Sequence, residues 1–231
     1  MLFRSSVTTF AVMNENGKKR IGVLFDLDGV LLDTEDIYTR FWEAVDRRYP
    51  TGVPDFAHVI KGSNLQEILH NHFPVESRQQ VTDMLNEFQR DMRYCFFAGA
   101  MEFVDQLNSA GIPAVVVTSS DQAKMNAVYS QHPDFKRHFA HVVTGDMVQN
   151  AKPDPECFLL GAKLIGCPIA DCYVFEDSVN GLRAAQSSGA TVIGLATTNS
   201  RSAIQCYSHC VIDHLEGFSV DDMLNVTPPA R

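Results

Sequence analysis

The 231-residue sequence predicts a doubly wound α/β fold, a mostly parallel Rossmann-like sheet covered by helices. Short apolar runs recur along the chain, and their continuous rather than alternating character is typical of strands buried on both faces. The segments between these runs are long enough to form helices. We expect strands at residues 21–25, 114–117, 141–143, 172–175, 191–195 and 210–212.

Local signals mark the ends of the helices between these strands. Gly111 and Gly189 each close a short run that suits the C-terminus of a helix. Asp154 and Pro155 have the residue types of an N-cap followed by the first helical position. We therefore expect residues 20–33 and 99–231 to form a Rossmann-like core domain.

One segment is much longer than an ordinary connection. Residues 34–98 lie between the first two expected strands, whereas such connections usually take only a few residues. No part of the segment alternates as a strand would, and apolar residues recur at helical spacing, as at Phe41, Val45, Val81 and Leu85. We expect residues 34–98 to form an all-helical cap domain inserted into the core.

Composition restricts the class of protein and its surroundings. A net charge of −9 argues against non-specific binding of nucleic acid, which depends on surplus Lys and Arg. The six cysteines include no Cys-x-x-Cys pair, and no apolar stretch approaches the length of a membrane span. We expect a cytoplasmic monomer, with residues 1–19 as a loose leader and Met13 as an alternative start to Met1.

Polar side chains follow four of the expected strands, at the sheet edge where ligands bind in open α/β folds. Asp26 and Asp28 follow the first strand and Thr118 and Ser119 the second. Lys152 lies in the loop after the third strand, and the fourth ends in Glu176 and Asp177. The residues expected to converge there are Asp26, Asp28, Thr118, Ser119, Lys152, Glu176 and Asp177.

The side chains in this set are of the types that bind a metal ion and a phosphate. The acids supply hard oxygen ligands that suit Mg²⁺, and Mg²⁺ commonly shares its coordination shell with water and phosphate. Thr118 and Ser119 stand where a helix is expected to begin, so their backbone N–H groups could hold an anion. Taken singly, the acids could form turns or helix caps and Lys152 could be a surface residue. Their joint occurrence in one chain order favours a site for Mg²⁺ and a phosphate.

Four stretches of the sequence carry a resemblance to a known family. They are FDLDGVLLDTE at residues 25–35, VVVTSS at 115–120, AKPDPECF at 151–158 and VFEDSVNGLRAAQSSGA at 174–190. Together they resemble the motifs of the haloacid dehalogenase superfamily, most closely its β-phosphoglucomutase-like branch with a helical cap. The resemblance covers nearly the whole chain after residue 20 and implies a Rossmann-like core, Mg²⁺ and an aspartyl-phosphate intermediate.

The resemblance also implies a role for each matching residue. Asp26 matches the nucleophile and Asp28 the general acid and base, and Thr118 and Ser119 match the phosphate-binding motif. Lys152 matches the lysine of the third motif, which serves both catalysis and phosphate binding. The metal set that it implies is Asp26, Asp28 (through its backbone carbonyl), Glu176 and Asp177. Asp28 speaks against dehalogenase chemistry, because only a phosphate ester has a leaving-group oxygen to protonate.

The function expected from these motifs is Mg²⁺-dependent hydrolysis of a small, sugar-phosphate-like monoester. A mutase of the β-phosphoglucomutase type is the alternative, but Tyr38 and Leu65 replace its cap His and Arg, and Asp121-Gln122 replaces its Lys-Asn pair. A phospho-accepting or catalytically dead binding domain is a remote alternative. Receiver domains are shorter and lack both the insertion and a second Asp two residues after the acceptor.

A polar loop in the insertion is the expected contact between cap and substrate. Lys61 and Asn64 lie in the stretch Lys61-Gly62-Ser63-Asn64, between apolar helical segments. An ordinary surface turn is the other interpretation of this loop. The substrate itself, a small-molecule phosphate ester, cannot be read from the sequence.

Overall fold

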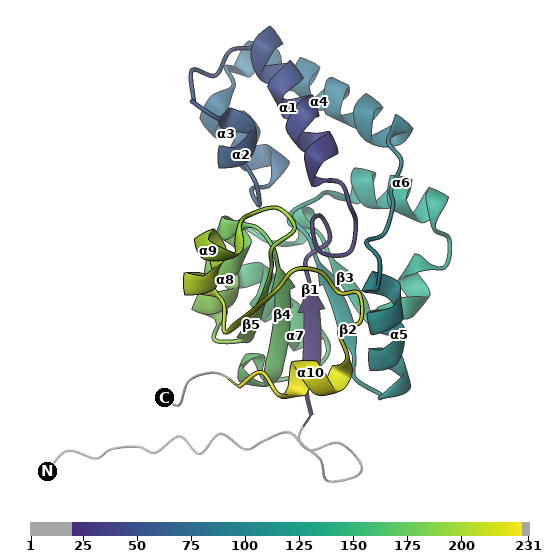
Figure 1. The fold of residues 1–231 in the computed structure, drawn as a ribbon. Helices are drawn as coiled ribbons and strands as arrows, with labels where there is room; N and C mark the ends of the chain where they lie inside the picture. Colours follow the sequence, from purple (N-terminus) through teal and green to yellow (C-terminus); the bar gives the residue numbers. More distant parts are fainter. Residues whose placement is uncertain (1–19, 228–231) are drawn as a thin grey trace, which may run out of the picture.

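The computed structural model describes residues 20–227, so the predicted leader and the alternative start at Met13 lie outside the described residues. Its centre is a parallel sheet of six strands in the order β3-β2-β1-β4-β5-β6 (Figure 1). The strands are β1 (Gly22–Phe25), β2 (Ala114–Val117), β3 (His141–Val143), β4 (Cys172–Glu176), β5 (Thr191–Leu195) and β6 (Cys210–Ile212). Each lies within a residue of its predicted bounds, and the predicted doubly wound α/β class is confirmed.

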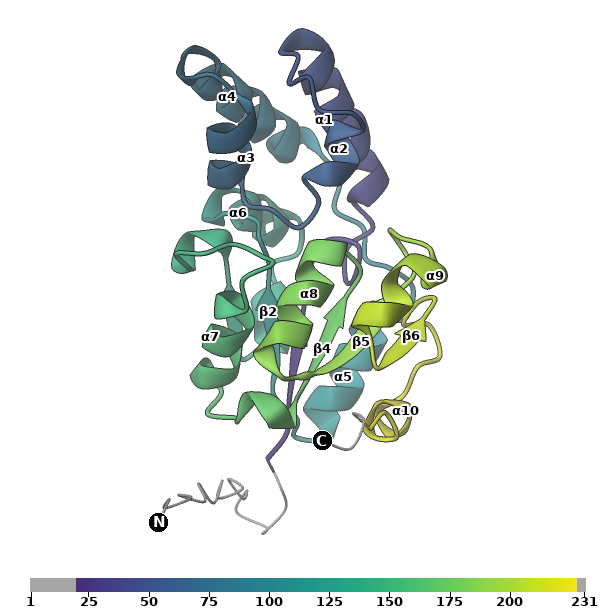
Figure 2. The same cartoon turned by 90° about the vertical axis from the view of Figure 1, so that its left-hand side faces the viewer.

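Helices cover both faces of this sheet (Figures 1 and 2). Since successive strand residues point to opposite faces, Val23 and Phe25 pack into one buried cluster while Leu24 packs into another. On the first face lie α5 (Ala100–Ser109), α6 (Gln122–Gln131) and α10 (Val220–Leu224). On the second face lie α7 (Glu156–Leu164), α8 (Val179–Ser188) and α9 (Arg201–Ile204). Burial on both sides explains the continuous apolar runs in the sequence.

Four further helices lie beyond the carboxyl ends of the strands (Figure 1). They are α1 (Glu35–Arg48), α2 (Phe56–Val59), α3 (Leu65–His72) and α4 (Val75–Asp91), all between β1 and β2 in the chain. Phe41, Val45, Val81 and Leu85 belong to a hydrophobic cluster of their own, separate from the two sheet clusters. We call these four helices the cap; its predicted boundaries at residues 34 and 98 stay a prediction.

The strand order creates one switch point in the sheet. The chain runs outward from β1 to β3 on one side and then from β4 to β6 on the other. β1 and β4 are neighbours in register, with Phe25 beside Phe175. Loops therefore leave in opposite directions beyond these two strands, and this is where doubly wound folds form their ligand crevice. No helix within residues 20–227 has both the length and the apolar character needed to cross a membrane.

Candidate active site

Three carboxylates meet at the carboxyl ends of β1 and β4. Asp26 follows β1, and its backbone N–H donates to the carbonyl of Phe175 at 3.0 Å. Glu176 is the last residue of β4, and Asp177 follows it. Each of the three acids is buried and offers an oxygen within 4.8 Å of the other two. The structure thus brings together three of the four residues of the predicted metal set.

A buried lysine ties two of these carboxylates together. Lys152 Nζ donates to Asp26 Oδ1 at 2.5 Å, to Glu176 Oε1 at 2.8 Å and to the carbonyl of Val117 at 3.3 Å. Burial by itself would lower the pKa of Lys152, but the Asp26 and Glu176 carboxylates outweigh it and raise the pKa above its ordinary value. Lys152 therefore stays a cation, as its predicted role requires.

One lysine does not balance the three acids. Burial raises the pKa of Asp26 to about 7, against the opposing effect of Lys152. Burial and the neighbouring Glu176 raise the pKa of Asp177 well above its ordinary value. Within the described residues, Asp177 Oδ2 is also buried without a hydrogen-bond partner. Closely spaced acids with raised pKa values and a free oxygen fit a divalent cation, because hard oxygen donors are what such ions take.

Glu176 is held in place by the start of α8. Its Oε2 accepts hydrogen bonds from the Ser178 backbone N–H at 2.7 Å and from Ser178 Oγ at 3.1 Å. Ser178 also caps α8 by accepting from the Gly181 N–H. Gly181 leaves the room that the carboxylate occupies, since a Cβ there would lie within 2.6 Å of Glu176 Oε2. The Glu-Asp-Ser sequence thus positions one acid and begins a helix in the same turn.

Thr118 and Ser119 lie on the loop after β2, beside the acids, but not at a helix start. The prediction that they begin a helix is wrong: α6 starts at Gln122, and Asp121 is its N-cap, accepting from the Lys124 N–H. Thr118 Oγ1 instead accepts from the Ser120 N–H at 3.0 Å, which holds the loop in a turn. The expected anion site at a helix N-terminus is therefore absent at these two residues. Both residues still line the pocket, and together with Lys152 they line a small second cavity.

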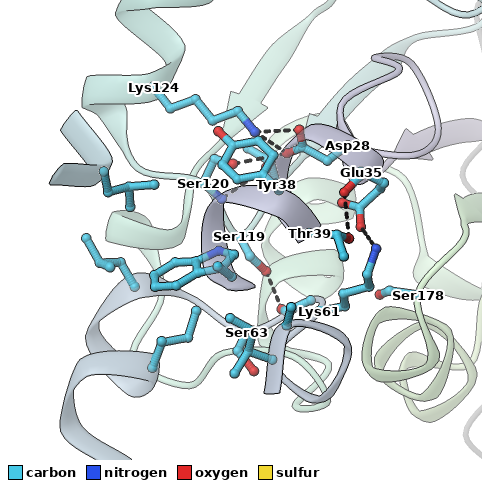
Figure 3. Close-up of a pocket in the computed structure, with 18 of the residues that line it drawn as sticks. Asp28, Glu35, Tyr38, Thr39, Lys61, Ser63, Ser119, Ser120, Lys124 and Ser178 are labelled. Carbon is cyan, nitrogen blue, oxygen red and sulfur yellow. Dashed lines mark hydrogen bonds and ion pairs between the residues drawn. The ribbon is translucent and has the colours of Figure 1, made fainter. Parts of the chain in front are cut away.

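The Asp28 carboxylate lines a pocket between core and cap (Figure 3). Lys124 Nζ donates to both of its oxygens, Thr34 Oγ1 donates to Oδ1, and Ser120 Oγ donates to Oδ2 at 3.2 Å. Lys124 is buried and also lies over the ring of Tyr38, with Nζ 4.4 Å from its centroid. Asp28 is thus fixed on the side of the site from which a leaving group would face the cap.

Lys124 is a residue of the site that the sequence motifs do not reveal. It lies 96 residues from Asp28 in the chain, on the first turn of a helix that has no clear apolar face. No spacing rule connects it to the first strand. The only signal in the sequence is the short distance between Lys124 and the hydroxyl loop after β2. Asp121, three residues earlier, caps the same helix by accepting from the backbone N–H of Lys124 at 2.9 Å.

The cap loop that contains Lys61 and Asn64 reaches the core (Figure 3). Ser119 Oγ donates to the carbonyl of Gly62 at 2.6 Å, and Asn180 Nδ2 donates to the carbonyl of Lys61 at 2.9 Å. Lys61 Nζ donates to Glu35 Oε2 at 2.5 Å at the border of the pocket. Asn64 caps α3 and lines a small second cavity beside Thr118, Ser119 and Lys152. The loop thus meets the site, and its role toward substrate stays a prediction.

Fold and site together define a class of protein: an α/β enzyme whose carboxylates and lysine meet at the switch point of a parallel sheet. A family model of the haloacid dehalogenase-like hydrolases matches residues 22–189. The chain belongs to this family, which confirms the resemblance found in the sequence.

Known relatives agree with this membership, and a solved structure shares the fold. The chain is 31% identical over 182 residues to a Drosophila melanogaster protein named probable pseudouridine-5′-phosphatase, covering 74% of this chain and 79% of that protein. It is 28% identical to protein SUPPRESSOR OF QUENCHING 1 of Arabidopsis thaliana, but the match spans 92% of this chain and only 21% of that protein. A crystal structure of a family IA HAD hydrolase from Entamoeba histolytica superposes with a TM-score of 0.76 at 22% identity, covering 89% of this chain and 98% of the other. As predicted, the chain is a phosphoric monoester hydrolase.

Proposed function

We propose that the chain hydrolyses a small, sugar-phosphate-like monoester in two steps, with Mg²⁺ bound and Asp26 as the nucleophile. The observation that carries the proposal is the position of Lys152, which bridges Asp26 and Glu176 in the cluster of acids that also contains Asp177. A phosphoryl group that enters this space would meet a nucleophile and a fixed cation together. The phosphatases among the relatives support the same reaction class.

Asp26, Glu176, Asp177 and the backbone carbonyl of Asp28 would hold the Mg²⁺. The bound ion would neutralise the oxygens of the transferred phosphoryl group, as it does in phosphoryl transfer in general. Lys152 adds a second, permanent positive charge at the same place. Positioning and charge neutralisation of this kind supply most of the barrier reduction in such reactions.

In the first step, a carboxylate oxygen of Asp26 attacks phosphorus in line with the ester oxygen. The bond between phosphorus and the ester oxygen breaks, and Asp28 gives a proton to the departing alcohol. Asp28 must take up this proton from solvent before the step, because its carboxylate is otherwise paired with Lys124. In the second step, Asp28 takes a proton from water while the water oxygen attacks the aspartyl-phosphate. The bond between phosphorus and Asp26 then breaks and phosphate leaves. General acid–base catalysis of this kind typically increases the rate by ~10²–10⁴-fold.

We propose that Thr118 and Ser119 contact the phosphoryl oxygens from the loop after β2. Thr118 is buried and lines the pocket together with Asp26, while Ser119 Oγ is engaged with the cap loop. Their part in the reaction is to bind and orient the phosphoryl group. We propose that Lys61 and Asn64 contribute to the choice of ester from the cap side.

The pocket favours a phosphatase over a mutase. A mutase must hold a bisphosphate, so its cap needs a cation that is free to bind the distal phosphate. Among the described residues that line the pocket outside the sheet edge, both lysines already have carboxylate partners: Lys61 pairs with Glu35, and Lys124 pairs with Asp28. The cap positions that would correspond to the mutase His and Arg are Tyr38 and Leu65.

Two experiments test the proposal. Phosphate release from a panel of small monoesters is measured with Mg²⁺ and with EDTA, for the parent chain and for Asp26→Asn. We expect release only with Mg²⁺ and only from the parent chain; full activity of Asp26→Asn contradicts the nucleophile assignment. Incubation with β-glucose 1-phosphate and a trace of the 1,6-bisphosphate separates the alternatives, because a mutase would accumulate glucose 6-phosphate ahead of free phosphate. The cytoplasmic location and the monomeric state stay predictions from the sequence.

A further inference from the structure

The loop after β5 reaches the ends of both strands at the switch point of the sheet. It contains three consecutive polar residues outside the sequence motifs, Thr197, Thr198 and Asn199. Thr197 Oγ1 donates to the carbonyl of Gly29 at 2.5 Å, and Asn199 Nδ2 donates to the backbone carbonyl of Asp177 at 3.0 Å. Gly29 lies in the loop after β1, and Asp177 follows β4. The two hydrogen bonds thus fix the residue between them, Thr198, beside the cluster of acids.

The Asp177 carboxylate packs against the backbone of Gly29. Gly29 has a φ of +77°, and a Cβ there would collide with Asp177 Oδ2 and lie 2.8 Å from Thr198 Oγ1. A side chain is therefore excluded twice, by the left-handed backbone and by the carboxylate. Because both oxygens approach the same point, Asp177 Oδ2 and Thr198 Oγ1 are close neighbours.

Neither of these two oxygens has a hydrogen-bond partner within residues 20–227, although both are buried. A buried polar atom without a partner costs about 1–3 kcal/mol and needs an explanation. A hydroxyl hydrogen can rotate toward an acceptor, and an ionised carboxylate can only accept. One hydrogen bond from Thr198 to Asp177 would therefore satisfy both atoms. The hydroxyl already acts on this acid, since burial and Glu176 raise the pKa of Asp177 and Thr198 opposes them.

The other two acids of the cluster already have donors. Asp26 accepts from Lys152, and Glu176 accepts from Lys152 and from Ser178. In the described part of the chain, Asp177 is the one acid with a buried carboxylate oxygen that lacks a donor. It is therefore the acid whose orientation the contacts described so far do not explain.

We infer that Thr198 is a positioning residue for the metal ion: its hydroxyl donates to Asp177 Oδ2 and holds the carboxylate in the orientation that binds Mg²⁺. An ionised carboxylate has enough lone pairs for a hydroxyl and a metal ion at the same time. Carboxylates that bind metals are generally held by such hydrogen bonds, and loss of one typically weakens metal affinity by about 10–100-fold. The inference rests on the metal set of the proposed function, in which Asp177 is a ligand.

Calorimetry with Mg²⁺ alone, without any ester, tests the inference. Thr198→Val replaces the hydroxyl with a methyl group of similar size, so the donor is lost while the packing is kept. We expect the Kd for Mg²⁺ to rise by about 10–100-fold. Thr198→Ser keeps the hydroxyl and should restore most of the affinity. The matched control is Thr191→Val, a buried threonine at the opposite end of β5, which should bind Mg²⁺ as the parent chain does.

Phosphate release gives a second readout. In Thr198→Val, the Mg²⁺ concentration for half-maximal activity should rise by the same factor as the Kd. At saturating Mg²⁺, kcat and the KM for the ester should change much less, because Thr198 lines neither the pocket nor the small second cavity. A general loss of folded protein would lower kcat without shifting the Mg²⁺ concentration that is needed.

The outcomes separate this inference from the proposed function. If the parent chain binds Mg²⁺ but releases phosphate from no ester, the proposed function fails, and the calorimetric comparison still decides the role of Thr198. An unchanged Kd for Mg²⁺ in Thr198→Val overturns the inference. Equal weakening in Thr198→Ser and Thr198→Val also overturns it, because the affinity then depends on the shape of the side chain and not on its hydroxyl. A parent chain that binds no Mg²⁺ overturns both.

Discussion

Gly181 should not tolerate even one added methyl group, and its replacement by alanine tests how the site is held together. Gly181 lies in the first turn of α8, and a Cβ there would lie 2.6 Å from Glu176 Oε2 and closer still to Oε1 and Cδ. Glu176 is fully buried and cannot yield toward solvent. Gly181→Ala should therefore push the Glu176 carboxylate off Lys152 and out of the cluster of acids.

Two opposing effects set the size of the change. Alanine in place of a helical glycine normally stabilises a protein by about 1 kcal/mol. Breaking a buried ion pair by displacing one partner costs about 3–5 kcal/mol, and here the pair is the 2.8 Å contact between Lys152 and Glu176. We expect Gly181→Ala to lower the free energy of unfolding by about 2–4 kcal/mol, the difference between these effects. Phosphate release should fall by about 10²-fold or more, because misplacement by about 1 Å has that effect in active sites.

Urea unfolding in EDTA and phosphate release with Mg²⁺ measure the two quantities. The matched control is the same substitution in a Glu176→Ala background, where the carboxylate that would clash is gone. There we expect Gly181→Ala to stabilise the chain by up to about 1 kcal/mol, as in an ordinary helix. If the single variant is as stable and as active as the parent chain, Glu176 does not lie against α8 and the proposed metal set is wrong as well.

Three further predictions follow from the contacts of the site. Asp28→Ala should still bind Mg²⁺ in calorimetry but lose turnover of an alkyl phosphate by ~10²–10⁴-fold; hydrolysis at the parent rate would exclude Asp28 as the acid. Lys124→Met should destabilise the chain by about 1–3 kcal/mol in urea, because the half-buried Asp28 carboxylate loses its cation, whereas the same change in an Asp28→Asn background should cost less. Without metal, the free energy of unfolding should fall by up to about 4 kcal/mol as pH rises from about 4 to 7, since the folded pKa of Asp26 is about 7 and its ordinary value is 3.8. A folded state with the higher pKa binds the proton more tightly, so stability is lost as that proton leaves; unfolding curves that do not change with pH in EDTA would contradict this.

The sheet and the acids could be predicted because they depend on short-range patterns. Burial on both faces requires continuous apolar runs, and the carboxyl ends of parallel strands lie at one edge, so residues that follow the strands must meet there. Asp26, Glu176, Asp177 and Lys152 are predicted in this way. The structure brings oxygens of the three acids within 4.8 Å of one another and Lys152 into contact with Asp26 and Glu176.

The cap side of the site could not be predicted, for a different physical reason. Lys124 and Gln89 reach the pocket because of how α6 and α4 pack, and packing depends on contacts between residues far apart in the chain. Neither residue belongs to a sequence motif. From the sequence alone, a lysine in the first turn of a helix and a glutamine in a long helix are expected to lie on the surface. The prediction that a helix begins at Thr118 is wrong for a related reason. Ser120 and Asp121 are equally suited by residue type to a turn and an N-cap, and the structure uses them in these roles.

The opening motif of the chain can now be explained by its charges. Two aspartates stand two residues apart, and each has its own buried lysine: Lys152 for Asp26, from the loop after β3, and Lys124 for Asp28, from α6.

The pair around Asp28 is balanced. The group around Asp26 is not, because Lys152 must also serve Glu176, and Asp177 stands beside them. Three carboxylates with one lysine leave two negative charges in excess, the number that one divalent cation neutralises. Burial, and after it the neighbouring carboxylates, raise the pKa values of Asp26 and Asp177, so protons can take the place of a metal ion here. Binding of Mg²⁺ near pH 6 should therefore release protons, and calorimetric titrations in two buffers that differ in ionisation enthalpy would count them. Identical heats in both buffers would mean that no proton leaves on metal binding, which would contradict the raised pKa values of Asp26 and Asp177.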